Sequence, residues 1–102
     1  MSDSTDLPAP APSTVQHDEA GRTFFVMLDG QRAHADYELE GDRMVCTHTF
    51  VPPELRGRGL AEIVVRAALA EARRRGWRVV PACSYVETFI ARHVEFRDLL
   101  AS

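Results

Sequence analysis

A short stretch rich in glycine and arginine, Arg56 to Ala61 (RGRGLA), carries the clearest chemical signal in this sequence. The first backbone N–H groups of a helix have no intrahelical partner, and they bind anions readily. Gly57 and Gly59 lack a Cβ, so a phosphate group can approach the main chain closely. Arg56 and Arg58 add charged hydrogen-bond donors beside the glycines. The stretch therefore predicts a cradle for a pyrophosphate group.

Two common phosphate-binding motifs do not fit this stretch. A P-loop requires a Lys-Ser or Lys-Thr pair, and the chain contains no lysine. A dinucleotide fingerprint requires glycine or alanine at the position that Glu62 occupies. A third pattern begins with Gln or Arg, which any two residues separate from a Gly. One further residue separates that Gly from a final Gly or Ala. Arg56, Gly59 and Ala61 occupy the three defined positions. The stretch thus resembles the acetyl-CoA signature of the GCN5-related N-acetyltransferases.

Cys83 and His48 are candidates for the chemistry of acyl transfer. Cys83 directly precedes Ser84-Tyr85-Val86-Glu87, a capping-box pattern, and a helix N-terminus favours the thiolate. It is either a covalent nucleophile in a ping-pong reaction or an inert, small apolar residue. His48 is the histidine of the expected central strand. It is either a general base for an amine or a structural histidine.

The amino-terminal half predicts an antiparallel meander that positions His48. Arg22 to Leu28 is rich in Phe and Val, and Asp29-Gly30 is typical of a type I′ hairpin. The return strand, Arg32 to Leu39, alternates polar and apolar residues, as a half-solvated antiparallel strand does. Met44 to Val51 has apolar residues or Thr on both faces, which is typical of a central strand. Cys46 and His48 are expected to share one face of it.

The carboxyl-terminal half predicts a strand–helix–strand crossover around the cradle. A helix is expected from the glycines to about Arg75, with Gly76 as its stop. Trp77 to Val80 predicts a short strand parallel to the third one. A second helix is expected from near Tyr85, and a further helical turn or two over His93 to Leu100. The expected fold class is α/β (α+β), with a mixed sheet.

Length and composition predict one domain of 102 residues with a net charge of −3. This charge argues against general nucleic-acid binding. An apolar segment that could span a bilayer or act as a signal core is missing, so a cytoplasmic protein without membrane contact is expected. Two cysteines without a CxxC pair indicate neither a disulfide framework nor a metal site. The Pro- and Ala-rich residues 1–14 predict a disordered tail, followed by a domain over 15–102.

Two segments, HTFVPPELRGRGLA and VVPACSYVETFIARH, are similar to small single-domain GCN5-related N-acetyltransferase-like proteins of the YjdJ or NATD1 type. The resemblance runs from about Phe24 to the C-terminus. It implies a GNAT-like mixed sheet, with a CoA-binding helix in the crossover and a C-terminal helix. It also implies that acetyl-CoA or CoA binds with its thioester end near Cys83. The other implied contacts are the backbone of Phe50 and Val51 for pantetheine, and Arg56, Gly57, Arg58, Gly59, Leu60 and Ala61 for the pyrophosphate.

The resemblance implies an acetyl-CoA-dependent N-acetyltransferase that acts on an unidentified amine. The first strands are joined without inserted helices that would wall a pocket, and such an open site suits a protein or peptide amine. The alternative is a non-catalytic CoA- or acyl-CoA-binding module, because the motif explains cofactor binding and not turnover. Arg92-His93 replaces a Lys-His pair that proline often follows in the family, and Val94 replaces that proline. No role is therefore carried over to Arg92.

Overall fold

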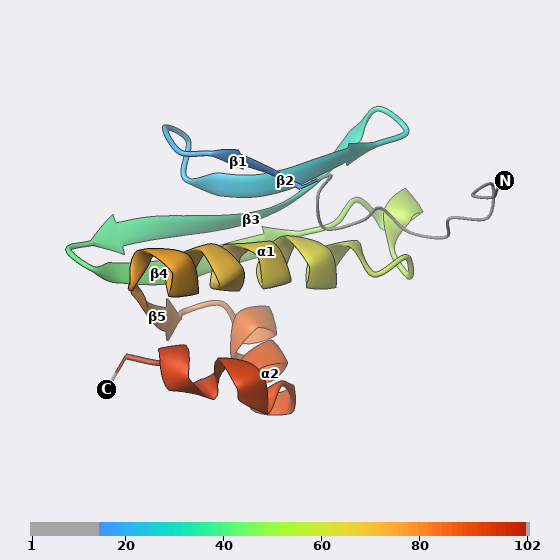
Figure 1. Ribbon diagram of the computed structural model, residues 1–102. Helices are drawn as coiled ribbons and strands as arrows, with labels where there is room; N and C mark the ends of the chain where they lie inside the picture. Colours follow the sequence, from blue (N-terminus) through green and yellow to red (C-terminus); the bar gives the residue numbers. More distant parts are fainter. Residues whose placement is uncertain (1–14, 102) are drawn as a thin grey trace, which may run out of the picture.

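Five strands form one mixed sheet in the computed structural model, which describes residues 15–101 (Figure 1). The first four strands are antiparallel to their neighbours, and the fifth is parallel to the fourth. This confirms the expected fold class, and the meander gains one short strand at its start. The expected disordered tail lies outside the described residues. The strands, in their order across the sheet, are β1 (Gln16–Asp18), β2 (Thr23–Leu28), β3 (Gln31–Glu40), β4 (Arg43–Phe50) and β5 (Arg78–Pro81).

Two α-helices follow the meander, with β5 between them. They are α1 (Leu60–Arg75) and α2 (Ser84–Arg92), and two 3-10 turns are η3 (Pro53–Leu55) and η4 (Val94–Leu99). Helix α1 ends at Gly76, which has a φ of 74° and was expected as the stop. Helix α2 has Cys83 as its N-cap residue, so the expected cap at Ser84 is off by one residue. None of the described helices is long and apolar enough to cross a membrane.

The β2–β3 connection is the tight hairpin that Asp29-Gly30 predicts. Leu28 pairs with Gln31, which leaves Asp29 and Gly30 as the two turn residues. Their φ values are 53° and 73°. Positive φ at both central residues defines a type I′ turn, whose twist matches that of the flanking strands.

A bulge in the β3–β4 ladder reverses the expected orientation of His48. Tyr37 pairs with Cys46, but Asp36 pairs with His48, so Thr47 is an additional residue on β4. Paired residues share a face, and neighbours along a strand alternate between faces. Cys46 therefore faces the core with Tyr37, whereas His48 is exposed on the opposite face with Asp36. The expectation that Cys46 and His48 share a face is wrong.

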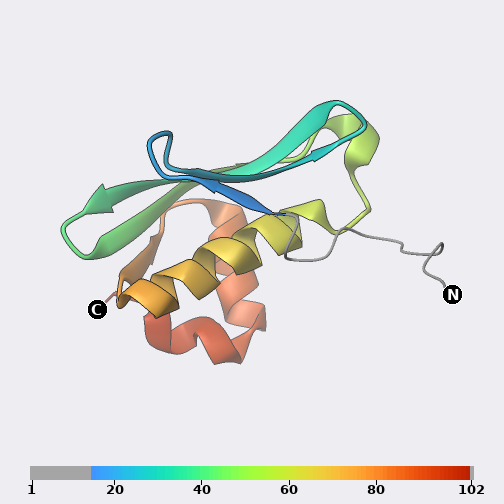
Figure 2. The ribbon, with the colours of Figure 1, turned by 45° about the horizontal axis from the view of Figure 1, so that its top comes forward.

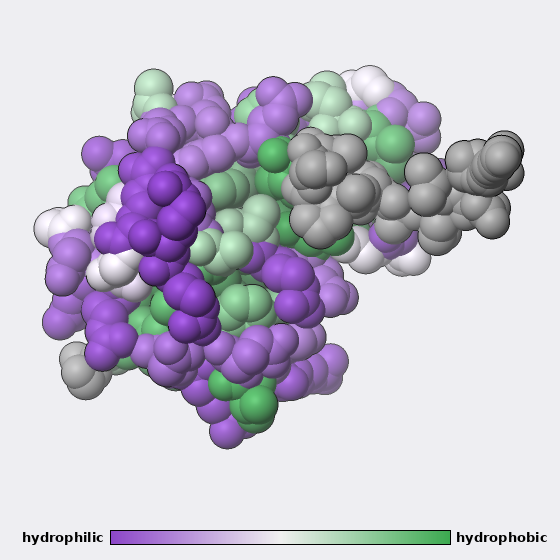
Figure 3. Space-filling model, in the orientation of Figure 1, coloured by the Kyte–Doolittle hydropathy of each residue, from purple (hydrophilic) through white to green (hydrophobic). Residues whose placement is uncertain are grey.

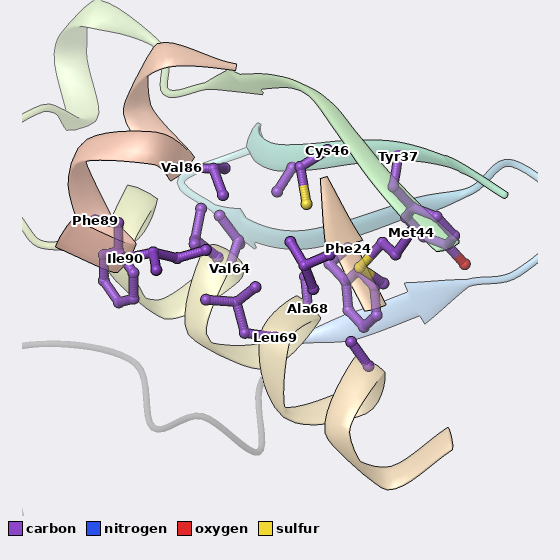
Figure 4. Packing of buried hydrophobic residues seen from close by; sticks show 14 of the residues in the cluster. Phe24, Tyr37, Met44, Cys46, Val64, Ala68, Leu69, Val86, Phe89 and Ile90 are labelled. Carbon is purple, nitrogen blue, oxygen red and sulfur yellow. The ribbon is translucent and has the colours of Figure 1, made fainter. Parts of the chain in front are cut away.

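The hydrophobic core lies between one face of the sheet and the two helices, which both lie on that side (Figure 2). Figure 4 shows side chains from the strands and from both helices meeting in this core. No helix within residues 15–101 packs on the opposite side, which we call the outer face of the sheet. Strand alternation places the following residues on the outer face: Phe25, Met27, Arg32, His34, Asp36, Glu38, His48 and Phe50.

The carboxyl-terminal end of α1 carries a charged cluster, and Figure 3 shows hydrophilic residues gathered over this end of the helix. Hydrogen bonds from Arg74 and Arg75 outweigh partial burial and lower the pKa of Glu71 from 4.5 to about 2. A lowered carboxyl pKa stabilises the fold at pH values above 4.5, and this stabilisation is lost as the pH falls toward 2.

We expect Glu71→Gln to lower the free energy of unfolding by about 1 kcal/mol at pH 7, because it removes this charged pair. The difference from wild type should shrink as the pH falls from 4.5 to about 2. Urea unfolding at several pH values measures it, with Glu54→Gln as the control at an exposed carboxylate. A difference that is independent of pH would contradict the assigned pKa.

Candidate functional site

The glycine turn before α1 has the geometry of an anion cradle. Gly57 and Gly59 have φ values of 86° and 77°, which favour glycine, and Gly59 is the N-cap residue of α1. The N–H of Ile63 donates to the carbonyl of Gly59. The N–H groups of the three residues before Ile63 therefore have no acceptor within the helix. A Cβ at either glycine would enter open space. The main chain is therefore open to a ligand at this turn.

A cavity of about 310 Å³ opens at the glycine turn. It is lined by six of the eight residues predicted to bind the cofactor, and by three others that include Tyr85 of α2. The structure thus brings the end of β4, the turn and the start of both helices around one space. The six predicted residues are Val51, Arg56, Gly57, Gly59, Leu60 and Ala61.

The two arginines of the turn point in different directions. Arg56 lines the cavity, and its Nε donates to the carbonyl of Val51 over 3.1 Å. Arg58 instead places Nη1 3.6 Å from Oδ2 of Asp29, in the β2–β3 hairpin. Arg56 is therefore held in the cavity, whereas Arg58 is directed to the hairpin.

This difference predicts unequal effects of two matched substitutions. We expect Arg56→Ala to weaken CoA binding by about tenfold, the loss of one charge-assisted hydrogen bond. Arg58→Ala should weaken it by less than about threefold, because an exposed charge contributes little. Isothermal titration with CoA measures both affinities. Equal losses in the two variants would contradict the assignment of the cavity to Arg56.

The open end of β4 lies beside Cys83. The ladder between β4 and β5 ends at the pair of Cys46 with Pro81, and β4 continues beyond it to Phe50. The chain leaves β5 and enters α2 at Cys83, whose Sγ lies 3.6 Å from Oγ1 of Thr49. Cys83 therefore lies at the unpaired edge of β4, beside Thr49, which is two residues before Val51 of the cavity.

The pKa values of the two cysteines are shifted in opposite directions. Burial raises the pKa of Cys83, but the backbone N–H of Val86, the hydroxyl of Thr49 and the backbone N–H of Tyr85 outweigh it, so this pKa lies below its usual 9.0. Burial, with repulsion from Cys83, raises the pKa of Cys46 to about 12. The thiolate is the reactive form of cysteine, so these shifts predict that Cys83 is the more reactive of the two.

His48 and the side chain of Phe50 lie on the outer face, away from Cys83. Their rings stack with centroids 6.5 Å apart. Cys83 contacts Thr49, which alternates with both residues along β4. The structure thus places His48 and Cys83 on opposite sides of the same strand. The backbone of Phe50, to which the resemblance assigns a contact with pantetheine, lies beyond the end of the β4–β5 ladder.

Tyr85 was not assigned a role from the sequence. It lies in the first turn of α2, is 37% exposed and lines the cavity together with Glu62. Burial, and then the charge of Glu62, raise the pKa of Tyr85, so its phenol remains a hydrogen-bond donor at neutral pH. Its place two residues after Cys83 was the available signal, but only the docking of α2 beside the turn brings it to the cavity.

Comparison with known proteins gives concordant matches. A family model described as GCN5-related N-acetyl-transferase matches residues 23–99. Protein NATD1 from Bos taurus is 39% identical over 82 residues, which cover 78% of this chain and 73% of that protein. Protein NATD1 from Homo sapiens is 37% identical, with coverages of 78% and 73%. The solution structure of a GCN5-like protein from Staphylococcus aureus has a TM-score of 0.69 at 20% identity, covers 86% of this chain and 87% of that one, and supports the fold.

Proposed function

The chain belongs to the GCN5-related N-acetyltransferase family, and on this premise we propose that it transfers the acetyl group of acetyl-CoA to an amine. The observation that carries the proposal is that a cavity at a glycine turn and Cys83 both lie along the open end of β4. A peptide or protein amine is the expected acceptor, because no helix within residues 15–101 covers the outer face.

The residues of the cavity account for cofactor binding. The N–H groups of Leu60 and Ala61, with the guanidinium of Arg56, would hold the pyrophosphate. The backbone of Phe50 and Val51 would hydrogen-bond the pantetheine arm. Bound acetyl-CoA supplies an acetyl group that is activated as a thioester.

Two routes for the transfer assign different roles to Cys83. In the first, the thiolate of Cys83 would attack the thioester and displace the CoA sulfur, which leaves as the thiol; the amine would then attack the acetyl-cysteine, and Cys83 would leave as the thiolate. In the second, Cys83 lines the thioester site and the amine attacks directly, with His48 as the general base. The lowered pKa of Cys83 favours the first route, whereas the position of His48 on the opposite side of β4 from Cys83 disfavours the second.

A non-catalytic CoA-binding module is the second candidate function. The specific observation that favours it is the placement of Cys83 and His48 on opposite sides of β4. A module of this kind needs the glycine turn and its cavity, and it needs neither of these two side chains.

The test combines binding and turnover. The pure protein is incubated with acetyl-CoA and a set of amines, namely a lysine-containing peptide, a free N-terminal peptide and an aliphatic diamine. We expect a rise in melting temperature, release of the free CoA thiol, and a mass increase of one acetyl group in an amine. A thermal shift without thiol release would favour the binding module. If acetyl-CoA caused neither a thermal shift nor thiol release, both candidate functions would be contradicted.

A further inference from the structure

The side chain of Thr49 connects the open end of β4 to the start of α2. Thr49 pairs with Ala35, a buried core residue of β3, so its half-buried side chain lies on the core side of the sheet. In the described part of the chain, no strand pairs with its other edge, because the β4–β5 ladder ends at Cys46. Its hydroxyl lies 3.6 Å from Sγ of Cys83, which is 34 residues further along the chain and also packs against the core. A hydrogen bond between segments so far apart fixes the sulfur relative to β4.

The hydroxyl of Thr49 is also the group best placed to bond this sulfur. Cys83 is the N-cap residue of α2, but its side chain makes no cap hydrogen bond. The N–H groups of Tyr85 and Val86 lie near the sulfur and favour its thiolate without reaching that geometry. A hydroxyl accepts a hydrogen bond from a thiol and donates one to a thiolate, so Thr49 can bond both forms of Cys83.

The ionisable groups around Cys83 are neutral at pH 7 or directed away from it. The thiol of Cys46, on the neighbouring part of β4, stays protonated because its pKa is raised to about 12. Burial raises the pKa of Tyr85, so its phenol is also neutral. Glu87 of α2 lines a separate cavity near η4, and His48 lies on the opposite side of β4. Hydrogen bonds rather than ion pairs therefore control the charge of Cys83.

We propose that Thr49 is a positioning residue of the acyl-transfer site: its hydroxyl holds the sulfur of Cys83 at the open edge of β4 and donates a hydrogen bond to the thiolate. This inference rests on the first route of the proposed function, in which that thiolate attacks the thioester. Thr49 forms no bond to the acetyl group and acts through Cys83 alone. A charge-assisted hydrogen bond stabilises the reactive form of the thiol and orients it toward the edge that the pantetheine arm would follow.

The test measures the pH dependence of Cys83 alkylation in the full-length protein, without CoA or an acceptor. Thr49→Val removes the hydroxyl and keeps the branched shape of the side chain. It should slow the reaction of Cys83 with iodoacetamide at pH 7 on the order of tenfold, because the thiolate loses a charge-assisted hydrogen bond. The rate at a pH above the pKa should stay near that of wild type, since the thiolate is then fully formed. Thr49→Ser retains the hydroxyl and should retain the wild-type profile.

Thr47→Val is the matched control, the same substitution on the same strand. Thr47 is exposed, and its hydroxyl donates to the carbonyl of Asp36 over 3.3 Å, away from Cys83. This variant should alkylate as wild type does. An unchanged profile in Thr49→Val would overturn the inference. Equal slowing in Thr47→Val and Thr49→Val would also overturn it, because the cause would then be a general disturbance of β4.

A second measurement separates this inference from its premise. The protein is mixed with acetyl-CoA alone, and intact mass follows the addition of one acetyl group to Cys83. Thr49→Val should acquire it on the order of tenfold more slowly than wild type at pH 7, with an unchanged dissociation constant for CoA. A variant that is acetylated as fast as wild type would overturn this inference alone. Wild type that forms no acetyl-cysteine would overturn the covalent route, and the role of Thr49 in acyl transfer with it.

Discussion

Replacement of Gly59 by valine is expected to abolish the stabilisation of the protein by acetyl-CoA. In the wild type this stabilisation should reach about 2.7 kcal/mol at a hundredfold excess of ligand over its dissociation constant. Gly59 has a φ of 77° and opens α1, where its missing Cβ leaves the main chain accessible. A branched side chain there would occupy the space that the phosphate needs, and thermal unfolding with and without acetyl-CoA measures the loss.

The matched control for this substitution is Gly41→Val. Gly41 also has a positive φ, of 64°, and a Cβ there would also enter open space, but it lies in the β3–β4 turn at the other end of β4. Both variants should therefore lose about 1–2 kcal/mol through backbone strain. Only Gly59→Val should lose the response to acetyl-CoA. Equal responses in the two variants would place the cradle elsewhere.

Alkylation of the two cysteines is expected to differ by more than about a thousandfold at neutral pH, because only the thiolate reacts. The pKa of Cys46 is raised to about 12 by burial, whereas that of Cys83 is lowered below 9.0. Raising the pH should increase labelling of Cys83 first, since the thiolate forms as the pH rises through the pKa. Iodoacetamide labelling followed by peptide mass analysis gives both rates.

Bound CoA should protect Cys83 from this labelling if the thioester end lies beside it. Cys46 is the internal control, since it should be labelled only after unfolding. Labelling of Cys83 that CoA does not change would remove it from the site. Covalent catalysis would require two further observations. An acetyl group must be found on Cys83, and Cys83→Ala must lose turnover. Turnover retained in that variant would assign the reaction to direct transfer.

Local sequence patterns determined most of the elements of this fold. Asp29-Gly30 adopts the turn that its residues favour, because positive φ values cost little at Asn, Asp and Gly. Gly76 ends α1 for the same reason. The RGRGLA stretch predicted a glycine turn at the start of a helix, since the glycines, the strand before them and the helix after them are contiguous in the chain. Short-range chemistry is sufficient for such features.

The tertiary structure decided how the sides of the sheet are used. The alternation of residues in β4 predicted one face for Cys46 and His48, but the bulge at Thr47 separates them. That bulge depends on pairing with β3, which residue spacing within β4 does not reveal. The contacts of Arg58 with Asp29 and of Thr23 with Asp36 likewise depend on how strands and turns meet. Packing and strand register, rather than local preference, place these side chains, because their partners come from other segments of the chain.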